Sequence, residues 1–305
     1  MKKSTKVRII IFDILIEIYK KNKNFDELFN SKAEQFKLDN QEKAFIFNVC
    51  LNTMRYNIHS KIILNNFVKK KLKNNQYILL ISAITQLVFL NIKSYAVVNE
   101  SVEVAKKIGI FPSFINAVLK KIAQNIQELK KTTINKSDLP EWFQKEIQKQ
   151  HNLKLDILIK TYFFEPSLHL VFKSNRYLKK FSENYVISSN NSAFISSKKK
   201  VSQLNDYNKG YWWVQNFSSM LPILLGPNLK NKSILDLCAA PGGKAFQVML
   251  ENNNIILNDI SKKRISKLKE NLARLNFSAI IKNYNALNFP KDKRFDIIIL
   301  DAPCS

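Results

Sequence analysis

The stretch SILDLCAAPGGK, residues 233–244, decides the fold of this chain. Its apolar run 234–237 predicts a short buried strand, and the apolar segment 245–250 that follows predicts a helix. Two of the five glycines in the sequence are adjacent here, at Gly242 and Gly243. Glycine lets the backbone approach a ligand closely, although a tight turn without a ligand is the alternative for a glycine pair alone. The spacing matches neither the dinucleotide fingerprint nor a phosphate-binding loop, which favours a nucleoside ligand lacking phosphate.

Strand and helix patterns alternate through the residues that follow this stretch. Apolar runs at 255–257, 279–281 and 297–300 predict three more strands, and residues 262–275 predict a helix. Buried strands separated by helices are typical of parallel βαβ units and of a doubly wound, Rossmann-like α/β sheet. Such sheets bind ligands beyond the carboxyl ends of their strands.

Polar residues follow three of these predicted strands. Asp259 is placed to accept hydrogen bonds from ribose hydroxyls, although it can equally cap the next helix. Asn285 can meet an adenine edge, with a surface turn as the alternative. Asp301 begins the sequence Asp-Ala-Pro-Cys-Ser, which puts the thiol of Cys304 at the ligand crevice. A buried structural role is the usual one for an isolated cysteine, and the position at the crevice argues against it.

The chain upstream of residue 216 divides into two further predicted regions. Residues 1–130 have helical periodicity almost throughout, which predicts an all-α bundle of about six or seven helices. A polar stretch then predicts a linker. Residues 139–215 mix helix and strand patterns, with strands expected at 168–172, 185–188 and 210–214, and predict a small α+β region.

Composition restricts the class of protein further. A length of 305 residues fits two or three domains, and a net charge of +25 indicates a polyanionic partner such as nucleic acid. The excess is almost entirely lysine, so nucleotide bias in an A/T-rich genome is the alternative explanation. Three scattered cysteines exclude a disulfide framework or a zinc site and indicate a reducing, cytoplasmic location. No segment is long and apolar enough to span a membrane, so we expect a soluble protein that binds neither membrane nor metal.

Three segments resemble motifs of the S-adenosylmethionine-dependent RNA cytosine-5 methyltransferases. They are ILDLCAAPGGK (234–244), NDISKKRISKLKENLARL (258–275) and FDIIILDAPCS (295–305). GYWWVQNFSSMLPILL (210–225) resembles the segment that precedes the cofactor loop in that family, and LPEWF (139–143) resembles the start of its small flanking domain.

The helical region resembles the NusB-like RNA-binding domain in QLVFLNIKSYAVVNESVEVAKK (86–107) and FINAVLKKI (114–122). Together the segments are similar to the small-subunit (16S) ribosomal RNA methyltransferase B family of the Sun or Fmu type. The resemblance implies three parts: a NusB-like bundle (1–130), a small α+β RNA-binding region (139–215) and a Rossmann-like class I methyltransferase domain (216–305), incomplete at its C-terminus.

The resemblance also implies a cofactor and a partner. The cofactor is S-adenosyl-L-methionine, and the partner is small-subunit ribosomal RNA, bound by a cytoplasmic monomer. The implied cofactor-binding residues are Cys238, Ala239, Ala240, Pro241, Gly242, Gly243, Lys244, Asp259, Asn285 and Asp301. The family usually has Asp where this chain has Asn285, so we expect adenine binding to be weaker here.

Cytosine-5 methylation in this family uses two cysteines. A thiolate adds to carbon 6 of the base, carbon 5 takes the methyl group, and a second cysteine assists product release. Cys304 corresponds to the second. The nucleophile of the later Thr-Cys-Ser-like motif is absent from the sequence, so we expect a fragment or truncated product without activity. A non-catalytic RNA-binding remnant is the alternative function, and a Rossmann-type dehydrogenase fails on the glycine pattern.

Overall fold

The structure is a computed structural model, and it divides into two compact units, residues 1–164 and 165–305. Each unit is described separately. The residues described are 2–150, 157–159, 166–197, 199–252, 254–290 and 292–302.

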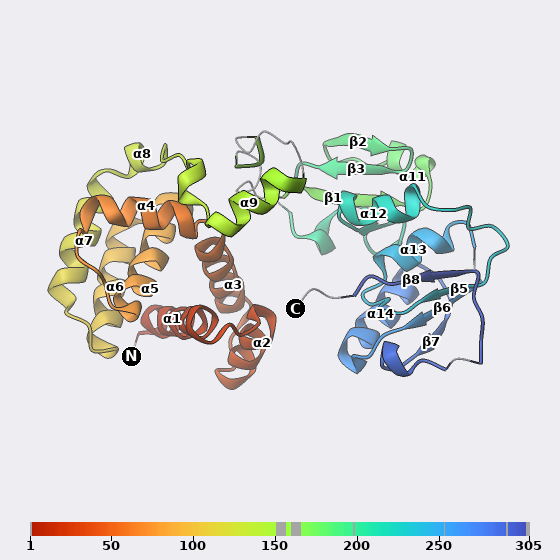
Figure 1. The fold of residues 1–305 in the computed structure, drawn as a ribbon, viewed down its shortest axis with the longest axis horizontal. Helices are drawn as coiled ribbons and strands as arrows, with labels where there is room; N and C mark the ends of the chain where they lie inside the picture. Colours follow the sequence, from red (N-terminus) through yellow and green to blue (C-terminus); the bar gives the residue numbers. More distant parts are fainter. Residues whose placement is uncertain are drawn as a thin grey trace. The chain divides into compact units, whose positions relative to one another are not determined.

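The first unit is a helical bundle, as the periodicity predicts (Figure 1). Its helices are α1 (Lys3–Lys21), α2 (Phe25–Gln35), α3 (Asn40–Arg55), α4 (Asn57–Phe67), α5 (Asn74–Ile84), α6 (Ser94–Lys107), α7 (Pro112–Gln124), α8 (Ile126–Leu129) and α9 (Glu141–Gln150). A π-helical turn, η1 (Thr85–Phe89), continues α5, and a 3-10 turn, η2 (Lys136–Asp138), precedes α9.

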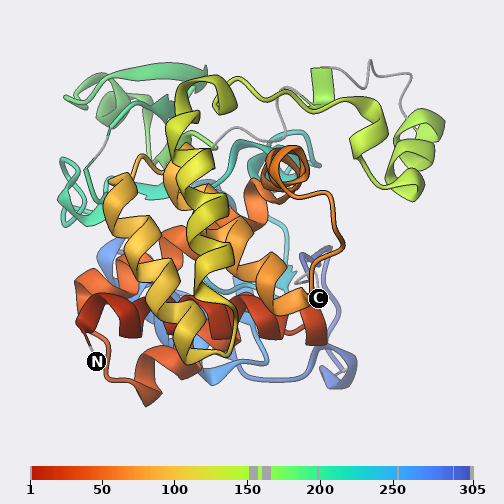
Figure 2. The same ribbon diagram turned by 90° about the vertical axis from the view of Figure 1, so that its left-hand side faces the viewer.

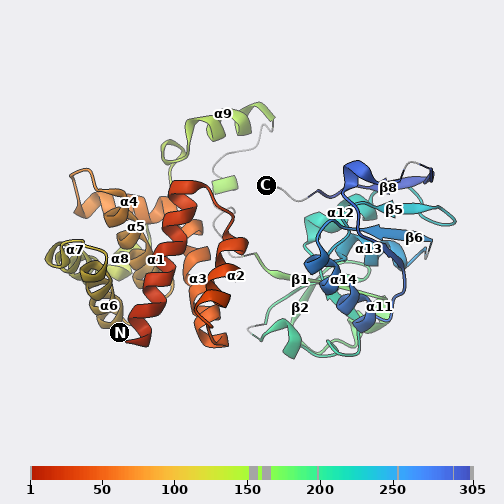
Figure 3. The same ribbon diagram turned by 90° about the horizontal axis from the view of Figure 1, so that it is seen from below.

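One continuous apolar core joins the helices of this bundle. Ile14, Leu15 and Ile46 are fully buried in it, at 0% exposure, because the apolar positions of α1 and α3 recur on one face of each helix. Figure 2 shows α6 and α7 side by side, and Figure 3 shows α1 beside α3. The start of α3 has the side-chain contacts of a capping box, formed by Asp39 and Glu42.

Helix α9 packs within the first unit, although it falls inside the predicted α+β region 139–215. Phe143 and Ile147 of α9 join a small apolar cluster that contains Leu139 and Ile58 of α4. An amphipathic helix must bury its apolar face, and α4 supplies the surface. The division into three domains at the predicted boundaries stays a prediction.

The second unit contains an antiparallel sheet whose strand order is β2-β3-β1-β4. Its strands are β1 (Leu168–Phe172), β2 (Tyr185–Ser189), β3 (Ser192–Ile195) and β4 (Trp212–Val214), with α11 (Asn175–Lys179) and the 3-10 turn η3 (Val201–Gln203) between them. The sequence patterns indicate β1, β2 and β4 but miss β3. The sequence of β3, Ser-Ala-Phe-Ile, has no alternation of polar and apolar residues, and its pairing with β1 and β2 defines it.

The second sheet of this unit is parallel and has the strand order β7-β6-β5-β8 (Figure 1). Its strands are β5 (Ile234–Asp236), β6 (Ile255–Asn258), β7 (Ile280–Lys282) and β8 (Ile297–Ile299). Its helices are α12 (Phe217–Leu224), α13 (Gly243–Met249) and α14 (Lys262–Arg274), and the 3-10 turn η4 (Ala286–Asn288) follows β7. Because β5 pairs with β6 on one side and β8 on the other, its carboxyl end is a topological switch point, where such sheets bind ligands.

The end of α14 joins the two sheets of this unit. Arg274 donates hydrogen bonds to the carbonyl oxygens of Tyr207 (2.9 Å) and Trp212 (3.1 Å), and its guanidinium lies over the Tyr207 ring. Gly210 has a φ of +64°, and a Cβ there would lie 1.9 Å from the Arg274 carbonyl oxygen. Only glycine permits so close an approach.

Candidate functional site

The β5–α13 loop, residues 237–242, connects the switch point of the parallel sheet to α13. Gly242 has a φ of +118°, and a Cβ added there would lie 2.0 Å from the Phe246 ring. Gly243 has room by comparison, since its Cβ would reach Gln215 only at 3.4 Å. The first of the two glycines is therefore required by the backbone conformation and by packing.

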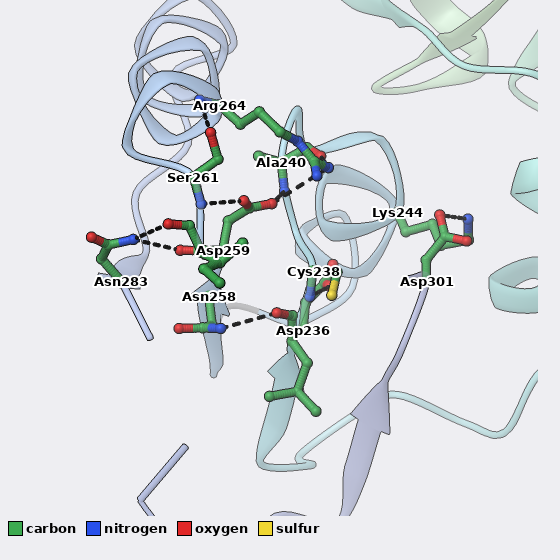
Figure 4. Close-up of polar contacts among 12 residues, drawn as sticks. Asp236, Cys238, Ala240, Lys244, Asn258, Asp259, Ser261, Arg264, Asn283 and Asp301 are labelled. Atoms are coloured by element: carbon green, nitrogen blue, oxygen red, sulfur yellow. Dashed lines mark hydrogen bonds and ion pairs between the residues drawn. The ribbon is translucent and has the colours of Figure 1, made fainter. Parts of the chain in front are cut away.

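Asp259 holds this loop from the end of β6 (Figure 4). Asp259 is 1% exposed, and its carboxylate accepts hydrogen bonds from the backbone N–H of Ala240 (3.3 Å) and of Ser261 (2.9 Å). Arg264, in the first turn of α14, lies 3.4 Å from the same carboxylate and also donates to the Ala240 carbonyl. Asp259 and Arg264 together fix both polar backbone groups of Ala240.

Two asparagine side chains also hold the backbone of the loop and of the neighbouring strand end. Asn258, fully buried, donates to the carbonyl oxygens of Leu237 and Tyr284, each at 3.0 Å, and accepts the Tyr284 N–H at 2.9 Å. Asn271 of α14 donates to the Pro241 carbonyl at 3.0 Å. The loop is thus held by side-chain hydrogen bonds to its backbone rather than by apolar packing alone.

A pocket of about 480 Å³ lies beside the loop. It is lined by Val214, Gln215, Asn216, Ser219, Asp236, Cys238, Ala239, Ala240, Pro241, Gly243, Lys244, Arg264, Asp301 and Ala302. Its polar wall includes Gln215, which accepts from the Trp213 indole N–H at 2.8 Å and donates to Gln247 at 2.5 Å.

Charged groups gather at one side of this pocket. Lys244 forms an ion pair with Asp301, whose side chain is 62% exposed (Figure 4). Asp236 is 2% exposed, and burial, together with the nearby carboxylates of Asp301 and Asp259, raises its pKa to about 7 despite a hydrogen bond from the Cys238 N–H.

The structure brings most of the expected cofactor residues together. Seven of them line the pocket: Cys238, Ala239, Ala240, Pro241, Gly243, Lys244 and Asp301. Gly242 and Asp259 stand behind this lining and shape the loop. Asn285 is exposed and caps η4 by accepting the Leu287 N–H at 3.1 Å, which is the contact of a surface turn residue.

Sequence reasoning missed seven of the residues that line the pocket, and three of them shape its polar wall or hold its loop. Asp236 lies in the quoted loop motif, Gln215 in the segment before it and Arg264 in the α14 motif. Their residue types alone did not distinguish them from ordinary residues of a strand, a loop and a helix. The signal for Arg264 was its place in the first turn of a helix that starts just after Asp259.

The two cysteines in the described part of the chain have suppressed thiolates. Cys50 is fully buried in the bundle core, and burial raises the pKa of its thiol far above the ordinary value. Burial and the carboxylates of Asp259 and Asp236 raise the pKa of Cys238. Cys304 lies outside the described residues. Among the described residues no group of His, Cys, Asp and Glu is arranged to hold a metal ion, and no helix has the length and apolar composition to cross a membrane.

An open parallel sheet with a pocket at its switch point, next to a glycine-containing loop, defines a doubly wound, Rossmann-like α/β domain. Residues 222–305 match the family model described as 16S rRNA methyltransferase RsmB/F, and residues 5–124 match the NusB family model. The chain therefore combines a helical, NusB-like region with an α/β region that is similar to the RsmB/F methyltransferases.

Relatives named ribosomal RNA small subunit methyltransferase B resemble the chain over most of its length. The protein of Photorhabdus laumondii is 29% identical over 294 residues, which cover 89% of this chain and 68% of the relative. The protein of Serratia proteamaculans is 27% identical over 293 residues, covering 88% and 68%. The crystal structure of PH0851 superposes with a TM-score of 0.58 at 15% identity, over 100% of this chain and 75% of that one, which shows a shared fold.

Proposed function

We propose that the second unit binds S-adenosylmethionine in the pocket beside the β5–α13 loop, and that the chain serves cytosine-5 methylation of small-subunit ribosomal RNA. The observation that carries the proposal is the pocket itself, because the residues of the CAAPGGK motif form its wall at the switch point of the sheet. The names of the relatives support the ribosomal RNA substrate.

The residues present fit such a cofactor. A volume of about 480 Å³ lies within the ~300–1,000 Å³ that ligand pockets of small molecules span. The wall offers a carboxylate at Asp236 and a Lys244–Asp301 ion pair, which suit an amino acid group and a positively charged sulfur. Bound there, S-adenosylmethionine supplies a methyl group on a sulfonium, from which a nucleophilic carbon can take it.

The protein groups around the pocket bind and orient. Arg264 and Asp259 fix Ala240, so that the loop backbone presents the same surface to each ligand molecule. We propose that Asp259 also accepts hydrogen bonds from the ribose hydroxyls, and that Asn285 meets the adenine edge. The first assignment requires the loop to open toward Asp259, which is 1% exposed and lies behind the pocket lining. The second assignment requires Asn285 to leave the cap that it forms on η4.

The cytosine chemistry is assigned by resemblance. Cys304 takes the role of the product-release cysteine. Cys50 and Cys238 do not suit the role of nucleophile, because the raised pKa of each thiol leaves little thiolate near neutral pH. Among the cysteines of this sequence, none is assigned to attack carbon 6.

RNA binding is proposed to rest on the positive charge of the chain, which acts as a monomer in the cytoplasm. Lysines cluster in the sequence at Lys69–Lys73 and Lys120–Lys121 of the NusB-like region and at Lys198–Lys200 further along the chain. Binding of ribosomal RNA fragments should weaken steeply with salt, with a log–log slope of roughly −0.7 per contacted phosphate for single strands. A slope near zero would contradict an electrostatic interface.

The direct test of the proposal is calorimetric titration of the chain with S-adenosylmethionine. We expect saturable binding of one molecule per chain, and the same experiment with ATP should give no binding because the loop lacks a phosphate-binding pattern. Absence of binding by S-adenosylmethionine, or tighter binding of ATP, would refute the assignment of the pocket.

A further inference from the structure

Asp236 is a buried carboxylate of the pocket wall, and the proposed function leaves open which group of the ligand it meets. It ends β5 and is 2% exposed, yet it forms part of the pocket wall. One of its oxygens, Oδ1, accepts the Cys238 N–H at 3.3 Å. No donor within the described residues forms a hydrogen bond with its other oxygen.

The cations nearest to Asp236 are already paired with other carboxylates. Lys244, in the first turn of α13, pairs with Asp301 after β8. Arg264, on α14, pairs with Asp259 at the end of β6. The remaining titratable neighbour is the Cys238 thiol, in the loop. The wall thus holds the carboxylates of Asp236 and Asp301 and the cations of Lys244 and Arg264, with Asp259 behind it. Of these three carboxylates, Asp236 is the one without an ion pair in the described part of the chain.

We propose that Asp236 is the group through which the pocket selects a positively charged ligand, and that the ligand supplies the cation that Asp236 lacks. This inference rests on the proposed function, since it names the charge that the same pocket recognises. A buried carboxylate gains most from an opposite charge when water is excluded from the pair.

Binding of a cation beside Asp236 should be coupled to release of a proton. Without ligand, burial and the two neighbouring carboxylates hold the pKa of Asp236 at about 7, so the group is partly protonated near neutral pH. A bound cation favours the carboxylate and lowers that pKa, so binding releases the Asp236 proton to the buffer. Because the free form binds the proton more tightly, affinity should rise with pH and level off above the free pKa. Between pH 6 and pH 8 the gain should be roughly tenfold.

Two positively charged groups of the proposed ligand can play this part. S-adenosylmethionine has a sulfonium and an α-ammonium group, whereas S-adenosylhomocysteine keeps the ammonium and has a neutral thioether. Proton release with both ligands assigns the partner of Asp236 to the ammonium. Release with S-adenosylmethionine alone assigns it to the sulfonium and makes Asp236 a discriminator between cofactor and product.

The test is titration calorimetry of the full chain in buffers of different ionisation enthalpy, which counts the protons released on binding. We expect about half a proton per S-adenosylmethionine at pH 7. D236N, in which the amide oxygen can still accept the Cys238 N–H, should release none, bind at least about tenfold more weakly at pH 8 and show no pH dependence. E251Q, which removes an exposed carboxylate of the same unit outside the pocket wall, should behave as the wild type.

The outcomes separate this inference from the proposed function. Wild-type binding without proton release, or D236N binding with unchanged affinity and pH dependence, overturns the role of Asp236 and leaves the pocket assignment standing. No binding of either adenosyl ligand overturns both. Where D236N does not fold by circular dichroism, the proton count of the wild type decides.

Discussion

Different interactions hold the core of the helical bundle and the β5–α13 loop. In the bundle, side chains such as Ile14 and Ile46 pack on one another at 0% exposure. In the loop, Asp259, Arg264 and Asn271 bind backbone groups from β6 and α14. Apolar packing tolerates small shifts, whereas hydrogen bonds to backbone depend on direction. Substitutions in the bundle should therefore affect stability, and substitutions around the loop should affect ligand affinity.

The largest effect is expected from I46A in the bundle core. Removing a fully buried isoleucine should lower the free energy of unfolding by about 2–5 kcal/mol, while the affinity of the folded chain for S-adenosylmethionine stays unchanged. Denaturant unfolding and calorimetry measure the two quantities. Y95A, at a side chain 67% exposed, is the control and should change stability by less than about 0.5 kcal/mol. A loss of affinity in folded I46A would break the comparison.

G242A should come next. A φ of +118° and a Cβ only 2.0 Å from the Phe246 ring require the loop to move, at a cost of about 1–3 kcal/mol for the backbone conformation alone. Affinity for S-adenosylmethionine should fall at least about tenfold. Because Gly243 lines the pocket, the matched comparison with G243A is made on the free energy of unfolding, which should fall less there since its Cβ would make an ordinary contact with Gln215. Equal losses of stability in the two variants would show that the loop is less constrained than its geometry indicates.

D259A should weaken cofactor binding by roughly tenfold, since the Ala240 and Ser261 N–H groups and Arg264 lose their shared acceptor. Titration calorimetry measures the change. D292A, at an exposed carboxyl of the same unit, should leave the affinity as it is. An unchanged affinity in D259A would remove Asp259 from both its loop-holding and its ribose-binding roles.

The smallest effects are expected from substitutions of helix N-caps, which are present in both regions. Asn24 caps α2 of the bundle, and Ser261 caps α14, whose first turn contains Arg264. Alanine at either position should lower the free energy of unfolding by about 1 kcal/mol. Only S261A should also weaken cofactor binding, by a few-fold, because the cap positions Arg264. Equal ligand affinities of N24A and S261A would show that the position of α14 does not affect the conformation of the loop.

The sequence predicted the elements that have strong periodicity. The strand expected at 234–237 is β5 and the helix expected at 262–275 is α14, because each has a pattern that local propensity and burial both favour. The pattern 77–90 predicts one helix, and the structure divides it into α5 and the π turn η1. Thr85 there donates to the Ile81 carbonyl at 2.9 Å, and such a side-chain bond competes with the backbone ladder.

The sequence was sufficient to predict the position of the loop, but not the ion pairs that surround it. The CAAPGGK string marks where the backbone turns, and six of its seven residues line the pocket as expected. Nothing in the string shows that Lys244 pairs with Asp301 or that Arg264 pairs with Asp259, because those contacts depend on how distant strands align. The raised pKa of Asp236 depends on its burial and on the carboxylates of Asp301 and Asp259 that the fold brings near it, so the sequence could not indicate it.

The most direct test of the account is hydrogen–deuterium exchange of the full chain with and without S-adenosylmethionine. The ligand should slow exchange in peptides covering residues 236–244 and 259–264, where the loop and its supports lie, and leave those covering α1 and α3 unchanged. Protection confined to the bundle, or exchange that is unaffected everywhere at saturating ligand, would contradict the claim that the β5–α13 loop forms the cofactor site.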